Sequence, residues 1–350
     1  MTIVILILML SLLIFVHEFG HFIAAKKVGV YVSEFALGMG PKIFSFKRKK
    51  HNDPTEYSLR LFPIGGFCAM AGEVDEDAKG LKKNEFMCNR TKWERFLILI
   101  AGVTMNTITA FIILFLQGLI YGTPEQKSIV GYAPEGYPIS EAGIEVGDRV
   151  IKINGYKVNT WDKMTLVMNL KHESDTYEFV VKKQDGSTKT YNISPKIEKQ
   201  EDGKEVKIYG IGAGNKIYRG FLPSLKYAFT KLGSIVSSMF LIIGSLFTGK
   251  LGVSSLSGPV GMYSLVGESA KVGFQSIMYL TAYLSLNLAV INVLPFSALD
   301  GGRILFVLIE AIKGSKVNPK VENYFHTIGF ILLMLLMVYI TIQDIIRLTH

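Results

Sequence analysis

Cysteine is scarce in this chain of 350 residues. Only Cys68 and Cys88 are present, and they are not at C-x-x-C spacing. Such a pair implies neither a disulfide nor a cysteine-ligated structural zinc site, so both thiols are expected to be reduced bystanders. An inverted repeat between the two halves of the chain is also lacking, which argues against a transporter with polar groups along its transport path.

Charge is missing from the start of the chain, because Thr2 to Phe15 contains no ionisable residue. Apolar residues make up 49% of the sequence, which suits a part-membrane protein with a soluble domain. Four segments reach the length of about 20 apolar residues that a bilayer requires: 2–25, 96–121, 274–299 and 328–346. The first lacks a basic start and a small-residue cleavage site, so we expect a retained span rather than a signal peptide.

The net charge of +9 could indicate nucleic-acid binding, but no aromatic-plus-basic motif is present and the basic residues gather beside the spans. The positive-inside rule makes such flanks cytoplasmic. Both chain ends and residues 122–273 are then extracytoplasmic. The flanking residues are Lys26, Lys27, Lys42, Lys47, Arg48, Lys49, Lys50 and Arg60 after the first span, Arg90, Lys92 and Arg95 before the second, and Lys313, Lys316 and Lys320 before the fourth.

The first span contains His17-Glu18-Phe19-Gly20-His21. Two histidines at i and i+4 lie on one face of a helix and can bind one Zn²⁺, while Glu18 is placed to act as a general base toward water. In a soluble helix this short pattern is often innocuous. Inside a membrane span, however, two histidines and a glutamate are costly to insert and are functional by default. The motif therefore predicts a zinc site.

A catalytic zinc usually takes three protein ligands, and Asp300 in Leu299-Asp300-Gly301-Gly302 is the candidate for the third. The first and third spans run in the same direction. His17, His21 and Asp300 are therefore expected at similar depth, near the cytoplasmic ends of their spans. The alternative is an ordinary Asp-Gly-Gly turn that ends a helix, which leaves the carboxylate at membrane depth unexplained.

Several ordered motifs resemble the site-2 protease family of intramembrane zinc metalloproteases, in particular its bacterial RseP-type (regulator of sigma-E protease) branch. The resemblance covers nearly the whole chain. It rests on His17–His21, on 35–43, 56–59, 63–67 and 71–73, on Ala101-Gly102 with Asn106, on 257–261, and on 292–295 leading into 299–302.

The resemblance implies a single zinc ion bound by His17, His21 and Asp300, with Glu18 as general base. It also implies that Asn287, Asn292 and Pro295 hold an unwound substrate beside the metal. The chain departs from the family pattern at Val103 and Ser297, where proline is usual. The departures leave the proposed ligands untouched, although the shape of the substrate groove could differ.

Residues 56–73 have strand-like composition around a Pro-Ile-Gly-Gly turn. The family places a membrane re-entrant β-hairpin here, and Gly65, Gly66 and Phe67 are candidate substrate-binding residues. A free strand edge could pair with an extended substrate, which matters because a helical substrate hides its amides. A plain cytoplasmic hairpin is the alternative.

Residues 140–155 resemble the middle of a bacterial PDZ domain, with Asn154-Gly155 as a hairpin signal. We expect an α+β PDZ domain at 122–200, acting as a size filter or as a structural lid without a ligand. A connector at 201–273 is expected to contain a membrane-surface helix at 222–251. The membrane core is then formed by residues 1–121 and 274–350.

These expectations describe an α-helical polytopic protein of the cytoplasmic (inner) membrane, with four transmembrane helices, a re-entrant hairpin and a PDZ domain. The resemblance implies an endopeptidase that cuts single-pass membrane proteins, such as anti-sigma factors, or remnant signal peptides, within the bilayer and near its cytoplasmic side. No nucleic-acid partner is expected. The alternative from another class is a catalytically silent membrane adaptor that presents its PDZ domain.

Overall fold

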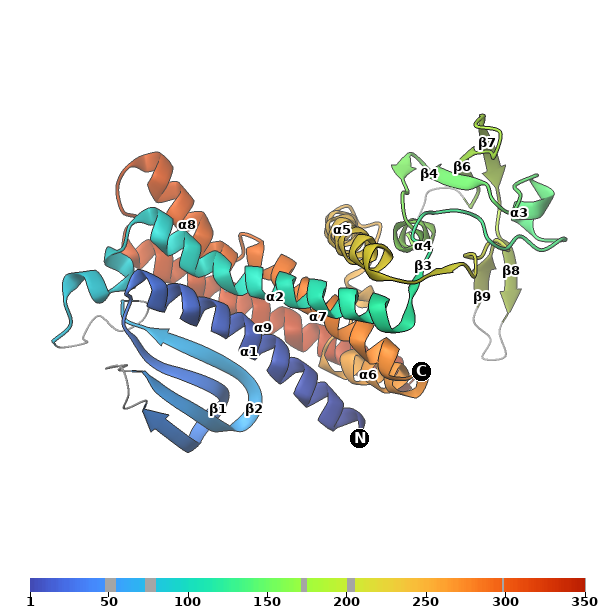
Figure 1. The fold of residues 1–350 in the computed structure, drawn as a ribbon. Helices are drawn as coiled ribbons and strands as arrows, with labels where there is room; N and C mark the ends of the chain where they lie inside the picture. Colours follow the sequence, from blue (N-terminus) through green and yellow to red (C-terminus); the bar gives the residue numbers. More distant parts are fainter. Residues whose placement is uncertain (48–54, 73–79, 171–174, 200–204, 298, 350) are drawn as a thin grey trace. The chain divides into compact units, whose positions relative to one another are not determined.

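The computed structural model describes residues 1–47, 55–72, 80–170, 175–199, 205–297 and 299–349. The chain forms two compact units, one of residues 1–113 with 256–350 and one of residues 114–255 (Figure 1). The expected hairpin end at Glu73, the basic run Arg48, Lys49 and Lys50, and the expected domain boundary at residue 200 lie outside the described residues.

The first unit is built mainly from long apolar helices. Its helices are α1 (Thr2–Val28), the first part of α2 (Lys92–Tyr121), α6 (Pro259–Val272), α7 (Phe274–Val293), α8 (Asp300–Lys313) and α9 (Pro319–Thr349), with short 3₁₀ turns at Lys83–Glu85 and Met87–Asn89. Helices α1, α2 and α9 contain the first, second and fourth expected spans, and α7 covers the third as far as Val293. Helix α1 ends at Val28 rather than at residue 25, α2 begins at Lys92 rather than at 96, and α9 begins at Pro319 rather than at 328.

The expected end of the third span at Leu299 is wrong, because α7 stops at Val293 and a separate helix begins at Asp300. Pro295 lacks a backbone N–H and cannot continue α7. The chain then turns so tightly that a Cβ on Gly301 would lie 2.0 Å from the Leu294 carbonyl oxygen. Asp300 therefore starts a helix instead of closing one.

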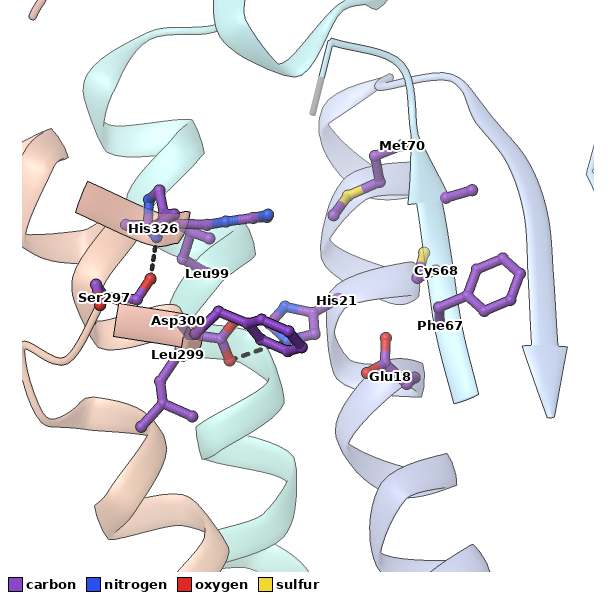
Figure 2. Close-up of a pocket in the computed structure, with 13 residues that line it drawn as sticks. Glu18, His21, Phe67, Cys68, Met70, Leu99, Ser297, Leu299, Asp300 and His326 are labelled. Atoms are coloured by element: carbon purple, nitrogen blue, oxygen red, sulfur yellow. Dashed lines mark hydrogen bonds and ion pairs between the residues drawn. The ribbon is translucent and has the colours of Figure 1, made fainter. Parts of the chain in front are cut away.

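Strands β1 (Val32–Lys47) and β2 (Glu56–Met70) form a long bent hairpin that packs against α1. The first half of β1 is paired on both of its sides, since Leu37 lies opposite both Gly66 and Leu59. The second half of β1 pairs with the start of β2, from Lys42 opposite Arg60 to Lys47 opposite Glu56. Residues 66–70 thus form an outer strand, which runs beside α1 (Figure 2).

The second unit contains a four-stranded antiparallel sheet in the order β5-β4-β6-β7. Its strands are β4 (Arg149–Ile153), β5 (Tyr156–Lys157), β6 (Tyr177–Lys182) and β7 (Thr188–Ile193). Helix α3 (Pro138–Glu141) precedes β4, and α4 (Trp161–Asn169) connects β5 to β6. Asn154 and Gly155, with φ of 46° and 80°, form the expected two-residue turn between β4 and β5. Two further pairs are β8 (Lys196–Lys199) with β9 (Glu205–Ile208), and β3 (Thr123–Pro124) with β10 (Ile217–Tyr218).

Helix α5 (Phe221–Phe247) follows the sheet and packs against α4. By length and composition α5 could cross a membrane. The described residues therefore contain five helices that could span, one more than the four spans expected from the sequence. A partly buried ion pair connects α5 to α4, because Lys231 Nζ lies 2.7 Å from Asp162 Oδ1. Ser234 Oγ also donates to Asp162 Oδ2 at 3.1 Å. The sheet domain and α5 are therefore joined at α4.

A buried ion pair gives a stability prediction for the sheet domain. Asp148 is fully buried, and its Oδ2 lies 2.6 Å from Lys183 Nζ. We expect Lys183→Met to lower the free energy of unfolding of this domain by about 2–3 kcal/mol, because it leaves a buried carboxylate without its cation. Faster amide hydrogen exchange across β6 would measure the loss, and the exposed Lys189→Met is the matched control. Equal protection in both variants would contradict the prediction.

Candidate metal centre

The two histidines of the HExxH motif lie one turn apart on α1, and Asp300 approaches them from the start of α8. His17 Nε2 lies 3.0 Å from Asp300 Oδ2, and His21 Nε2 lies 3.3 Å from the same oxygen. The two Nε2 atoms are 3.2 Å apart. Both histidines are buried. One possible ligand atom from each residue therefore lies within 4.8 Å of the other two.

The hydrogen bonds around these atoms fit a cation. His21 Nδ1 donates to the Ile98 carbonyl oxygen at 2.8 Å, so the neutral ring keeps a lone pair on Nε2. Asp300 Oδ2 is buried, and within the described part of the chain no N–H or O–H group donates a hydrogen bond to it. Each of the three converging atoms can offer a lone pair, and a bound metal ion would hold these lone pairs together. His17, His21 and Asp300 therefore fit a metal site.

Two glycines allow α1 and α2 to approach closely at this site. A Cβ on Gly102 would lie 2.5 Å from His21 Nε2 and 2.8 Å from His17 Cε1. A Cβ on Gly20 would lie 2.4 Å from the Ala101 carbonyl oxygen. Any side chain at either position would force the two helices apart. Gly20 of the HEFGH motif and Gly102 are thus both glycine for the same steric reason, the close approach of α1 and α2.

A cavity of about 550 Å³ opens beside His21 and Asp300. Glu18, His21, Phe67, Cys68 and Asp300 are among the residues that line it (Figure 2). The Glu18 side chain lies at the cavity wall near Cys68 (Figure 2). Burial raises the pKa of the Cys68 thiol to about 12, which disfavours the thiolate.

Among the expected substrate-binding residues, Asn292 lies nearest the possible ligands, with its Nδ2 3.4 Å from His17 Nε2. Phe67 lines the cavity, and Gly66 lies next to Glu18, since a Cβ there would be 3.7 Å from Glu18 Cγ.

The other three expected residues, like Asn292 and Gly66, are not among the residues that line the cavity. Asn287 has a buried Oδ1 that accepts no hydrogen bond from the described residues. Pro295 is exposed in the turn between α7 and α8. Gly65, with a φ of 94°, belongs to the bend of β2 rather than to the cavity.

Three residues near the site were not singled out as site residues from the sequence. Asn106 of α2 is completely buried, with its Nδ2 3.3 Å from His17 Nδ1. Arg303 and His326 line the cavity from α8 and α9. The spacing of Arg303, one turn after Asp300, could have revealed it, because residues at i and i+3 share a helix face. Nothing in the local sequence places His326 there.

The chain matches the family model described as peptidase family M50 over residues 5–336. It therefore belongs to peptidase family M50. This confirms the resemblance to the site-2 proteases and the expected enzyme class, an intramembrane metalloendopeptidase.

Curated relatives match the chain from end to end. It is 32% identical to the zinc metalloprotease RasP of Bacillus licheniformis, with 99% of each chain covered. It is 38% identical to a putative zinc metalloprotease of Fusobacterium nucleatum, covering 99% of this chain and 98% of the relative. It is 30% identical to the regulator of sigma-W protease RasP of Bacillus subtilis, with 99% of each chain covered.

Proposed function

We propose that this protein is a zinc-dependent endopeptidase that hydrolyses a peptide bond within the transmembrane segment of a single-pass membrane protein. Anti-sigma factors and remnant signal peptides are the substrate classes. The observation that carries the proposal is the meeting of His17 Nε2, His21 Nε2 and Asp300 Oδ2 at one buried point. The relatives' names add support, since they describe zinc metalloproteases and, in one case, a regulator of sigma-W.

A single zinc ion held by His17, His21 and Asp300 would polarise the scissile carbonyl and make a water molecule acidic enough to attack at neutral pH. Glu18 takes the proton of that water as it attacks the carbonyl carbon. The same carboxyl group then gives the proton to the leaving amide nitrogen, and the C–N bond breaks. Asn292, beside His17, is placed to hold the substrate backbone during these steps.

Four crossings agree with the geometry of the site better than five. His21 lies near the end of α1, and Asp300 follows the end of α7, so their contact requires α1 and α7 to cross in the same direction. Helix α2 returns the chain to the side where α1 began. A single crossing by α5 would start α7 on the wrong side, and α6, with 14 residues, is too short to cross back. We therefore propose that α5 lies along the membrane without crossing it.

The basic residues orient this arrangement. Lys26 and Lys27 follow the site on α1, and Lys313 and Lys316 follow it at and beyond the end of α8. The positive-inside rule then places the metal site toward the cytoplasmic face of the cell membrane. Water reaches the cavity from that side, as a hydrolysis requires.

The bent hairpin is suited to hold an extended substrate. Residues 66–70 pair with β1 on one side, and Phe67, Cys68, Ala69 and Met70 line the cavity. A substrate strand added to this edge would present its backbone to Glu18. The hairpin surface is also apolar enough to enter the membrane as a re-entrant element. Its exposed apolar side chains are Met39, Ile43, Phe44, Phe46, Leu59, Leu61 and Phe62.

The sheet domain at 122–200 is proposed to be an extracytoplasmic PDZ domain that limits the size of substrates. Its attachment to α5 through Asp162 and Lys231 supports this role, because a filter must be held at a fixed place on the membrane surface. The domain would then exclude membrane proteins whose outer domain has not been trimmed.

A reconstituted cleavage assay tests the proposed function. Purified protein in liposomes should cut single-pass substrates of the anti-sigma and signal-peptide classes, lose activity with a zinc chelator, and regain it when zinc is added. Metal analysis should give one zinc per chain. A protein that retains no zinc and cuts neither substrate class would be a catalytically silent adaptor instead.

A further inference from the structure

Asn106 lies on the far side of His17 from the proposed metal position. It is completely buried in α2, and its Nδ2 is 3.3 Å from His17 Nδ1. Its Oδ1 is also buried and receives no hydrogen bond from any described residue. A buried amide oxygen without a donor is costly, so this orientation of the amide requires an explanation.

The protonation of His17 supplies the explanation. An imidazole that offers Nε2 to a metal carries its proton on Nδ1 and needs an acceptor there. The NH₂ end of Asn106 cannot accept, whereas Oδ1 can. The two ends of an amide have nearly the same size, so the hydrogen bonds decide which end faces the ring. A half-turn of the amide places Oδ1 against Nδ1–H and satisfies both groups.

Helix α2 places a polar group against Nδ1 of each metal-ligand candidate, His17 and His21. His21 Nδ1 donates to the Ile98 carbonyl oxygen, and His17 Nδ1 faces the Asn106 amide. Gly102 lies midway between these positions and touches both rings. Residues 98, 102 and 106 recur every four positions, so they form one stripe along α2. This stripe is a surface that fixes both imidazoles from behind.

Helix α7 holds Asn106 in place. Ser285 Oγ donates to the Asn106 backbone oxygen at 2.8 Å, and Ser285 is itself completely buried. The amide therefore has a fixed backbone and a single imidazole within reach. Rotation of the amide is the adjustment that remains.

We propose that Asn106 is a positioning residue whose Oδ1 accepts the proton of His17 Nδ1, so that the lone pair of Nε2 points to the metal position. The inference rests on the proposed zinc site. Outer partners of this kind hold the ring in one tautomer and one orientation, and their loss typically weakens metal binding 10–100-fold.

Two substitutions of similar size distinguish a role of Asn106 as a hydrogen-bond acceptor from a role in packing alone. Asn106→Leu removes the acceptor, and we expect the zinc dissociation constant, measured by chelator competition in detergent, to rise about 10–100-fold. Asn106→Asp keeps an acceptor oxygen and should bind zinc about as tightly as the parent protein. Nitrogen NMR shifts of His17 should show the proton on Nδ1 in the parent and in Asn106→Asp, and a mixture of tautomers in Asn106→Leu.

Thr104→Leu is the control, because Thr104 lies exposed on the same helix and does not line the cavity. Its zinc affinity should stay close to that of the parent. Parent-like zinc binding by Asn106→Leu would overturn the positioning role and leave the zinc site standing. Equal losses in the Leu and Asp variants would show that Asn106 acts only by packing. A parent protein that binds no zinc would overturn the proposed function and this inference together.

Discussion

Replacement of Glu18 by glutamine should abolish cleavage of a transmembrane substrate in liposomes while zinc content and fold stay unchanged. Glutamine has nearly the same shape but cannot take a proton, so the attacking water loses its base. General acid–base groups contribute about 10²–10⁴-fold, and we expect a loss of about 10³-fold or more in kcat. The side chain lines the cavity without being one of the three converging ligands, so zinc should remain bound.

The matched control makes the same change on a glutamate away from the cavity. Glu268 lies on α6 and does not line the cavity, so Glu268→Gln should retain parental turnover and zinc. Normal cleavage by Glu18→Gln would refute the assignment of the base. Loss of zinc in that variant would instead mean that Glu18 belongs to the metal site.

The metal-ligand candidates were predictable from the sequence because two strong constraints meet in them. The helix period places His17 and His21 on one face, and the shared direction of two apolar spans brings Asp300 to the same depth. Neither argument needs tertiary packing. The hydropathy pattern also located the four long helices α1, α2, α7 and α9, since about 20 apolar residues are needed to cross a bilayer.

The third span was extended to Leu299 on its apolar composition, although Pro295 already indicated a helix break. Residues 294–299 remain largely apolar, yet Pro295 stops the helix and the Gly301 backbone packs on the Leu294 carbonyl. Residues 222–251 were expected to form a membrane-surface helix. An 18-residue window of α5 is also apolar enough to span, so hydropathy alone does not separate a surface helix from a crossing one here.

Asn106 was noted in the sequence only as part of a family motif and was not assigned to the site. Its significance depends on which helix faces His17, and that follows from packing rather than from local sequence. The same holds for His326, which reaches the cavity from α9. Residues whose role depends on the packing of a neighbouring helix cannot be identified from one sequence alone.

The substitution Gly102→Ala is also expected to reduce zinc affinity and substrate cleavage strongly. A Cβ there would lie 2.5 Å from His21 Nε2 and 2.9 Å from His17 Nδ1, closer than non-bonded atoms can approach. Gly102→Ala must therefore push α2 or both imidazoles away by several tenths of an ångström or more. Displacements of about 1 Å can cost about 10²-fold in rate, and we expect zinc affinity and cleavage to fall together by about that factor.

Gly233→Ala on α5 is the matched control, because a Cβ there meets no described atom within 4 Å. Alanine is favoured over glycine inside a helix by about 1 kcal/mol, so this variant should keep its zinc and be at least as stable as the parent. Chelator competition and thermal unfolding in detergent measure both quantities. If Gly102→Ala bound zinc like Gly233→Ala, α2 could not be the close support of the two imidazoles, and the steric reason for glycine at position 102 would be wrong.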